Sequence, residues 1–308
     1  MRDVAVVSFA SLVATDRDLD ETEMLVEVIG QALAKAKIPK SEIGFTCSGS
    51  CDYLGGRPFS FVMALDAVGA WPPISESHVE MDGAWALYEA WVRLQHGDID
   101  TALVYAFGRA TQGSLGDVLA TQLDPYNVAP LWPDDASIAG LQARALVDSG
   151  RCTESDAAHP RAPFADGATA VVLAVGDRAR RASARPAWIR GIDHRIEAHS
   201  LGARDLTRSS STEIAARKVG AHGRKVDVAE LHASYRHQEI ILRDALALPN
   251  DVAIGAGTRA PDPFIVAGLN RIGTAAQRIS DGGARSAIAH ATSGPCLQQN
   301  LVCLLEAE

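Results

Sequence analysis

The chain has few cysteines and few aromatic residues, and it has no long hydrophobic run. Five cysteines among 308 residues are too few for a disulfide scaffold, so we expect a reducing, cytoplasmic compartment. No run approaches the roughly eighteen apolar residues of a membrane helix, so no membrane span is expected. Basic residues are outnumbered by acidic ones, with a net charge of −9, which argues against nucleic-acid binding.

The remaining composition is that of a soluble globular protein. Hydrophobic residues make up 47% of the chain and charged residues 22%, which excludes a disordered or fibrous protein. The length suggests about two structural units. Cys47 and Cys51 are spaced as C-x3-C, but no second pair of ligands follows at zinc spacing. We therefore predict free thiols and no metal site.

Apolar strands alternate with amphipathic helices in two passages of similar order. The first half has predicted strands over 3–10, 43–50, 74–80, 101–108 and 166–175, and helices over 20–38, 59–70 and 83–96. The second half has predicted strands over 187–198, 225–232, 284–292 and 296–307, and helices over 210–220, 235–246 and 270–279. Residues 109–166 are rich in Gly, Pro, Asp and Ser, and only 136–150 is predicted as a helix there. The pattern indicates an α/β fold that was duplicated.

Four segments carry a family resemblance: HVEMDGAWALYEAWVRLQHGDIDTALVYAFG (78–108), DGATAVVLAV (166–175), VAELHASY (228–235) and the last two predicted strands. With these segments the chain resembles the thiolase superfamily, in the branch of sterol-carrier-protein thiolases and actinobacterial lipid-transfer proteins. The resemblance implies duplicated βαβαβαββ halves in five layers (αβαβα). It places the halves at 1–176 and 177–308, with a shortened loop domain at 109–166.

The first catalytic loop of the family, Cys-x-x-Gly, falls on Glu80-Met81-Asp82-Gly83. A thiol at a helix N-terminus is activated there by the macrodipole. Glu80 takes its place here, and a carboxylate is a poor acyl acceptor. No cysteine close in sequence replaces it. Glu80 with Asp82 could form an acid–base pair, or Asp82 could simply cap the helix.

The second loop, His-Asp-Cys-Phe in the resembled branch, reads His232-Ala233-Ser234-Tyr235. The histidine that helps to bind an oxyanion is kept, whereas serine cannot replace the thiol as a base. Tyr235 adds a phenol, which with His232 could serve a retro-aldol cleavage. A structural histidine beside a buried phenol is the alternative.

The two remaining loops also depart from the family. Gly-His-Pro should lie within 268–271, where Leu269 or Asn270 replaces the histidine. The last loop falls near His290–Gly294, or else on CLQQN (296–300), and the sequence leaves both registers open. Claisen chemistry by the family mechanism is therefore not expected.

Three hypotheses remain for the function. The resemblance implies a subunit of a heteromeric complex acting on lipid or steroid acyl-CoA, by retro-aldol cleavage if catalytic. A non-catalytic scaffold and a lipid or acyl-CoA binding protein are the alternatives. Implied partners are a thiolase-like paralogue, an OB-fold zinc-ribbon protein, or a second copy of the chain. No cofactor is implied beyond acyl-CoA as a substrate.

The candidate site follows from these loops. We assign Tyr235, His232 and Glu80 as catalytic candidates, and Ser234, Asn270, His290 and Asp82 as substrate-binding candidates. A buried core histidine is the simpler interpretation of His290.

Overall fold

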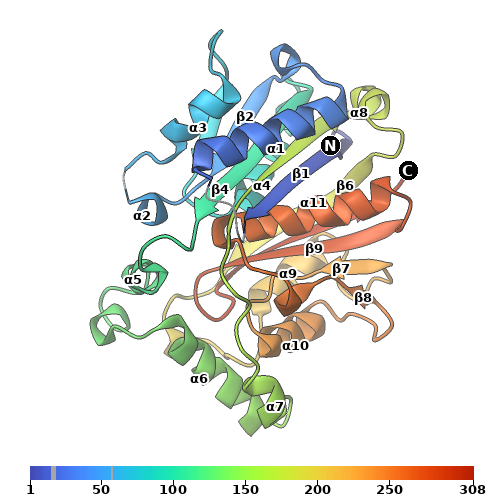
Figure 1. Ribbon diagram of the computed structural model, residues 1–308. Helices are drawn as coiled ribbons and strands as arrows, with labels where there is room; N and C mark the ends of the chain where they lie inside the picture. Colours follow the sequence, from blue (N-terminus) through green and yellow to red (C-terminus); the bar gives the residue numbers. More distant parts are fainter. Residues whose placement is uncertain (15–18, 57) are drawn as a thin grey trace.

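The computed structural model describes residues 1–14, 19–56 and 58–308 (Figure 1). Its strands form one mixed sheet in the order β3-β2-β4-β5-β1-β6-β10-β9-β7-β8. The strands are β1 (Val4–Ala14), β2 (Phe45–Gly49), β3 (Glu76–Val79), β4 (Thr101–Arg109), β5 (Asp166–Val175), β6 (Ala187–Ile196), β7 (Val228–Glu230), β8 (Ala253–Ile254), β9 (Ser286–Ser293) and β10 (Gln299–Glu306).

The two halves of this sheet share one topology. In each half the second strand lies parallel to the third and fourth. The fifth strand lies antiparallel to the first and fourth. The halves join where β1 pairs with β6 at Ala5–Trp188 and Val6–Ala187. The predicted duplication is confirmed.

Helices on both sides of each half complete five layers (Figure 1). The outer helices are α1 (Glu21–Ala36) and α3 (Phe61–Val68) on the first half, and α9 (Ser210–Lys218) and α10 (Arg236–Ala245) on the second. Between the halves lie α4 (Gly83–His96) and α11 (Ala267–Ser280). In the described part of the chain, three apolar cores fill the spaces between these layers, and the central one buries Leu87, Leu94, Leu269 and Ile272. Apolar stripes on both central helices therefore hold the two halves together.

Glycines allow the ends of the central helices to approach their neighbours closely. A Cβ at Gly83 would lie 2.5 Å from the Ala106 Cβ and 2.8 Å from Leu269 Cδ2. A Cβ at Gly268 would lie 2.5 Å from the Ala291 Cβ. Only a residue without a side chain fits at these two positions, so the close packing of α4 and α11 depends on them.

The segment between β4 and β5 is more helical than the sequence suggested. It contains α5 (Leu115–Thr121), α6 (Asp135–Asp148) and α7 (Glu154–Ala157). Only α6 was predicted, because α5 and α7 are too short to show a 3.6-residue period. Each is nevertheless capped in the expected way, by the side chains of Ser114 and Thr153.

Other boundaries differ from the predictions for local reasons. The predicted strand at 225–232 shortens to Val228–Glu230, because His232 already belongs to a loop. The strand predicted from 296 begins at Gln299, because Cys296 and Leu297 have positive φ angles of 54° and 58°. The strand β8 was not predicted, because a segment of two residues is too short to show the alternation of apolar and polar residues that indicates a strand.

We predict that Gly83→Ala lowers the free energy of unfolding by about 1–3 kcal/mol, because the new methyl group meets Ala106 and Leu269. Gly30→Ala is the matched control. Gly30 lies within α1, where a Cβ would have no neighbour within 4 Å, and alanine should stabilise the helix by about 0.5–1 kcal/mol. Urea denaturation of both variants measures the difference. Equal effects would contradict the close approach of α4 and α11.

Candidate functional site

A cavity of about 420 Å³ lies where the loops of both halves meet the β4–β5 segment. Its wall includes Glu80, Met81 and Asp82 before α4, and the 232–235 loop after β7. Two further sides are closed by the turn of the β9–β10 hairpin, residues 292–299, and by residues 119–123. Three of the four loops that the sequence singled out therefore border one space.

Asp82 binds the N-termini of both central helices. Its carboxylate accepts hydrogen bonds from Ala84 N (2.8 Å) in α4, and from Gly268 N (2.7 Å) and Leu269 N (3.0 Å) in α11. Burial raises the pKa of Asp82 to about 6, and nearby His232 and these amides limit the rise. The carboxylate therefore connects the halves as well as capping α4.

His232 lies in the loop after β7 and is almost fully buried. Its Nδ1 accepts a hydrogen bond from Thr292 N at 3.3 Å, so in the neutral ring the proton is on Nε2. That Nε2 atom lies 3.7 Å from Asp262 Oδ1. The hairpin between β9 and β10 thus fixes the orientation and the tautomer of the imidazole.

Asp262 is a buried acidic residue that the sequence analysis did not single out. It accepts hydrogen bonds from Arg161 Nη2 (2.9 Å) and Ser234 Oγ (2.8 Å). Burial works to raise the pKa of Asp262, but His232, Arg161 and Ser234 together hold it well below its usual range. The sequence showed no signal for it, since it stands in an irregular loop far along the chain from Arg161.

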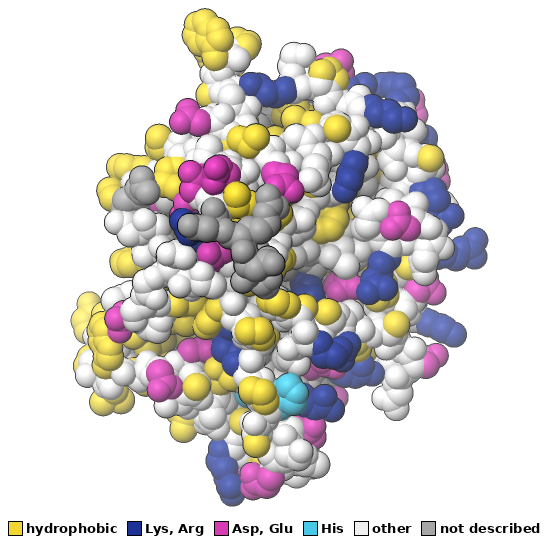
Figure 2. Space-filling view, in the orientation of Figure 1, with side chains coloured by type: hydrophobic (Ala, Val, Ile, Leu, Met, Phe, Trp, Pro, Cys, Tyr) yellow, Lys and Arg dark blue, Asp and Glu magenta, His cyan; other side chains and the backbone are white. Residues whose placement is uncertain are grey.

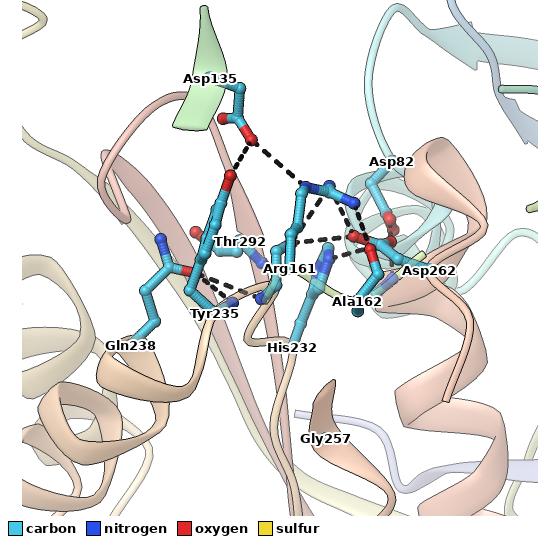
Figure 3. A network of polar contacts seen from close by, with 12 residues as sticks. Asp82, Asp135, Arg161, Ala162, His232, Tyr235, Gln238, Gly257, Asp262 and Thr292 are labelled. Carbon is cyan, nitrogen blue, oxygen red and sulfur yellow. Dashed lines mark hydrogen bonds and ion pairs between the residues drawn. The ribbon is translucent and has the colours of Figure 1, made fainter. Parts of the chain in front are cut away.

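Tyr235 donates a hydrogen bond from its hydroxyl to Asp135 Oδ2 at 2.7 Å (Figure 3). Arg161 Nε lies 3.2 Å from the same oxygen, so one guanidinium forms ion pairs with both Asp135 and Asp262. The guanidinium also stacks on Phe164, with Cζ 3.4 Å from the ring centroid. Burial and the Asp135 carboxylate raise the pKa of Tyr235, so the phenol stays protonated at neutral pH.

Glu80 borders the cavity, with Oε1 accepting a hydrogen bond from Asp52 N at 2.5 Å. Burial raises the pKa of its carboxyl group. No cysteine is close to Glu80 in sequence, but the fold brings Cys51 to the same cavity, within hydrogen-bonding reach of Glu80. Burial raises the pKa of that thiol, so it is not a ready thiolate.

Asn270 and His290 lie apart from the described residues that border the cavity. Asn270 accepts a hydrogen bond from Thr274 Oγ1 within α11 at 3.2 Å. His290 is fully buried in β9, where Nε2 lies 3.0 Å from Asn300 Oδ1. Burial lowers the pKa of His290 to about 3. Their proposed substrate contacts remain predictions, since the geometry shows only these internal partners.

The loop from Pro295 to Leu297 forms a wall of the cavity in a strained conformation. Arg204 donates hydrogen bonds to Pro295 O (3.0 Å) and Cys296 O (3.2 Å), which hold the positive φ angles in place. Both registers that the sequence left open fall on this β9–β10 hairpin. Either register therefore brings the same segment to the cavity.

Two buried glutamines connect this loop to the 232–235 loop. Gln142 of α6 donates to Cys296 O at 3.4 Å and accepts from Gln238 Nε2 at 3.3 Å. Gln238 Oε1 in turn accepts from the backbone N–H groups of Ser234 and Tyr235 at 3.2 and 3.3 Å. The β4–β5 segment thereby helps to position both loops.

The described residues contain no candidate metal site and no candidate membrane helix. No group of three or more His, Cys, Asp or Glu side chains within residues 1–14, 19–56 and 58–308 could hold a metal ion. Over the same residues, no helix combines the length and the apolar character needed to cross a bilayer.

Comparison with known proteins identifies the fold. No protein-family model and no curated protein matches the chain. Human mitochondrial 3-ketoacyl-CoA thiolase has a similar structure, with a TM-score of 0.73 and 13% identity over 100% of this chain and 99% of that chain. A structure of that enzyme in complex with CoA gives a TM-score of 0.71 and 14% identity, over 100% and 98%. The chain has the thiolase fold.

We predict that Asp82→Ala lowers the free energy of unfolding by about 3 kcal/mol, because it leaves three buried N–H groups at two helix ends without an acceptor. Asp134→Ala is the matched control, since Asp134 caps α6 alone through Ser137 N. Its loss should be clearly smaller in the same denaturation experiment. Equal losses would show that Asp82 does not join α4 to α11.

A pH dependence follows from His237 and His290, which burial keeps neutral. Burial lowers the pKa of His237 to about 4 and of His290 to about 3, from 6.5. The unfolded chain takes up both protons near pH 6.5, so acid removes stability. Asp82 acts in the opposite direction. Its pKa is raised to about 6, so the folded chain takes up a proton there near pH 6 and this offsets the uptake by one of the two histidines in the unfolded chain.

Together these three groups make the free energy of unfolding fall by about 1.4 kcal/mol per pH unit between pH 6 and 5. His237→Phe should remove most of this slope, because one of the two histidines no longer titrates. Denaturation at several pH values measures it. An unchanged slope in the variant would contradict the buried, neutral state of His237.

Proposed function

We propose that the chain binds an acyl thioester in the 420 Å³ cavity and cleaves a 3-hydroxyacyl group by retro-aldol chemistry. Apolar side chains such as Leu119, Ile138 and Ile265 line much of the cavity, and the polar candidates lie among them. The fold is shared with a 3-ketoacyl-CoA thiolase whose structure was solved with CoA. These features support a lipid or steroid acyl-CoA as the substrate.

The hydrogen bond from Tyr235 to Asp135 carries the proposal. Tyr235 accepts the proton of the substrate's 3-hydroxyl group while its own proton passes to Asp135 Oδ2, 2.7 Å away. A neutral phenol with a raised pKa suits this relay better than it suits a free phenolate base. As the proton leaves, the C2–C3 bond breaks, C3 becomes a carbonyl group, and the electron pair passes to the thioester as an enolate.

His232 stabilises the enolate and Glu80 protonates it. Because His232 Nδ1 accepts a hydrogen bond from Thr292 N, the proton is on Nε2, and this Nε2–H can donate to the thioester oxygen as negative charge develops there. Glu80, whose pKa burial raises, supplies the proton that C2 takes up. The products are a carbonyl compound and a shortened acyl thioester, and no free CoA is consumed.

A Claisen or thiolytic reaction is less well supported. Glu80 occupies the position before α4 where the resembled family places its nucleophile. Burial raises the pKa of the Cys51 and Cys296 thiols that border the cavity, the latter to about 12. Neither thiol is activated as a nucleophile, whereas the Tyr235–Asp135 pair is in place.

The proposal includes a partner protein, in the cytoplasm. Among the described residues, β3 is an edge strand that pairs with β2 alone. The segment before it exposes Phe59, Val62 and Trp71, with Trp71 85% exposed. Figure 2 shows further apolar side chains along the left edge of the molecule. A thiolase-like paralogue or an OB-fold zinc-ribbon protein is the partner we favour, and a homodimer is the alternative.

We predict that Tyr235→Phe lowers the rate of 3-hydroxyacyl-CoA cleavage by about 10²–10⁴-fold, because the relay to Asp135 loses its oxygen. The assay uses the tagged chain with whatever partner co-purifies from its native host. Tyr126→Phe, at an 87% exposed position, is the control and should keep full activity.

An unaffected rate in Tyr235→Phe would remove this residue from the mechanism. Absence of cleavage in the wild-type complex, with acyl-CoA still bound, would favour the lipid-binding alternative. Absence of both would favour the scaffold.

A further inference from the structure

Residues 197–204 follow β6 and contact the hairpin wall of the cavity, and we call them the strap. Arg204, the last residue of the strap, donates hydrogen bonds to Pro295 O at 3.0 Å and to Cys296 O at 3.2 Å. Pro295 and Cys296 border the cavity, whereas none of the strap's residues, all of which the structure describes, does so. The strap therefore supports this wall from outside the cavity.

The strap also reaches a second side of the cavity. His199 Nε2 lies 3.5 Å from Asp124 Oδ1. Asp124 directly follows Leu123, which borders the cavity. The strap, residues 122–124 and the tip of the hairpin meet around one small hollow beside the cavity. One short segment thus joins two sides of the cavity.

Arg204 restrains the backbone at two strained residues. Pro295 O belongs to the peptide unit before Cys296, and Cys296 O belongs to the unit before Leu297. Because a peptide unit is planar, a hydrogen bond that fixes its carbonyl oxygen also restrains the φ angle of the residue that follows. These φ angles are 54° for Cys296 and 58° for Leu297, in a region that costs free energy for residues other than glycine. Without Arg204, we expect both residues to relax toward negative φ.

The guanidinium of Arg204 is held in place at a cost in free energy. Burial lowers the pKa of Arg204, and its Nε atom is buried without a hydrogen-bond partner among the described residues. Charge-assisted hydrogen bonds to the two carbonyl oxygens offset this cost, since they are stronger than neutral ones. The stabilising effect of the buried cation is therefore directed at the loop that forms the cavity wall.

We propose that Arg204 is a positioning residue that holds the wall at 295–297 in the shape that fits the acyl group. The inference rests on the proposed function for the acyl group. It adds a residue outside the cavity that determines how tightly the acyl thioester binds. The hydrogen bonds of Tyr235 and His232 within the site do not involve Arg204, so the chemical step does not depend on it.

The first test compares KM with kcat for 3-hydroxydodecanoyl-CoA, using the full chain with its co-purifying partner. Arg204→Gln cannot hold both carbonyl groups, so it should raise KM by about tenfold. It should change kcat by less than about twofold, because the reacting groups keep their contacts. Arg208→Gln is the matched control, since Arg208 is largely exposed and pairs with Asp205. It should leave both constants unchanged.

A second substitution tests whether Arg204 acts through the backbone. Glycine adopts a positive φ angle without steric cost. Cys296→Gly added to Arg204→Gln should therefore restore much of the lost affinity, whereas Cys296→Ala in the same background should not. A residue that only stabilised the fold would not make this distinction between glycine and alanine.

The reactivity of Cys296 provides a measurement that is independent of activity. Its side chain is buried, and the thiol donates to Ile138 O at 3.5 Å. If the loop relaxes in Arg204→Gln, iodoacetamide should label Cys296 faster than in the wild-type protein, as followed by mass spectrometry of its peptide. Equal labelling rates would show that Arg204 does not hold the loop.

The outcomes separate this inference from the proposed function. If the wild-type complex cleaves the thioester and Arg204→Gln has an unchanged KM, or loses only kcat, the inference is overturned and the proposed function stands. If the complex binds the thioester without cleaving it, the proposed cleavage fails and the same variants test the wall through Kd. If it does neither, both fail.

Arg204→Lys replaces Arg204→Gln if the latter does not fold. Lysine keeps the buried charge, but a single ammonium group holds two carbonyl oxygens less firmly than a planar guanidinium does, so KM should still rise by about threefold. A KM equal to that of the wild-type protein would overturn the inference in this variant as well.

Discussion

The carboxylate of Asp82 is the interaction on which the site depends. It accepts from the first turn of α4 and from the first turn of α11, so a single side chain joins the central helices of the two halves. Glycines at 83 and 268 permit that approach. Once these helix ends are fixed, Glu80 and the 232–235 loop border the same cavity.

Arg161 binds two further carboxylates that border the site. The guanidinium binds Asp135 on one side and Asp262 on the other, so neither acid is left buried without a partner. Asp135 accepts the hydrogen bond from the Tyr235 hydroxyl group, while Asp262 lies beside His232. One cation thereby supports both the proposed proton relay and the proposed enolate-binding histidine.

The sequence predicted the elements that depend on local periodicity. The helix over 83–96 and the strand over 166–175 are found at the predicted residues, because each carries a continuous apolar pattern. Asp262, Arg161 and Cys51 could not be found in this way, since they stand in irregular segments and are brought to the site by contacts distant in sequence. The duplicated strand order was inferred from the resemblance, and the pairing of β1 with β6 needed the structure.

Product analysis tests the central claim most directly. The complex is incubated with a 3-hydroxyacyl-CoA labelled at C2 and C3, with and without free CoA, and the products are identified by mass spectrometry. Retro-aldol chemistry predicts a carbonyl compound that keeps C3 and an acyl-CoA that keeps C2, formed without free CoA. Cleavage that requires free CoA, or an acyl group retained on Cys51, would contradict the account.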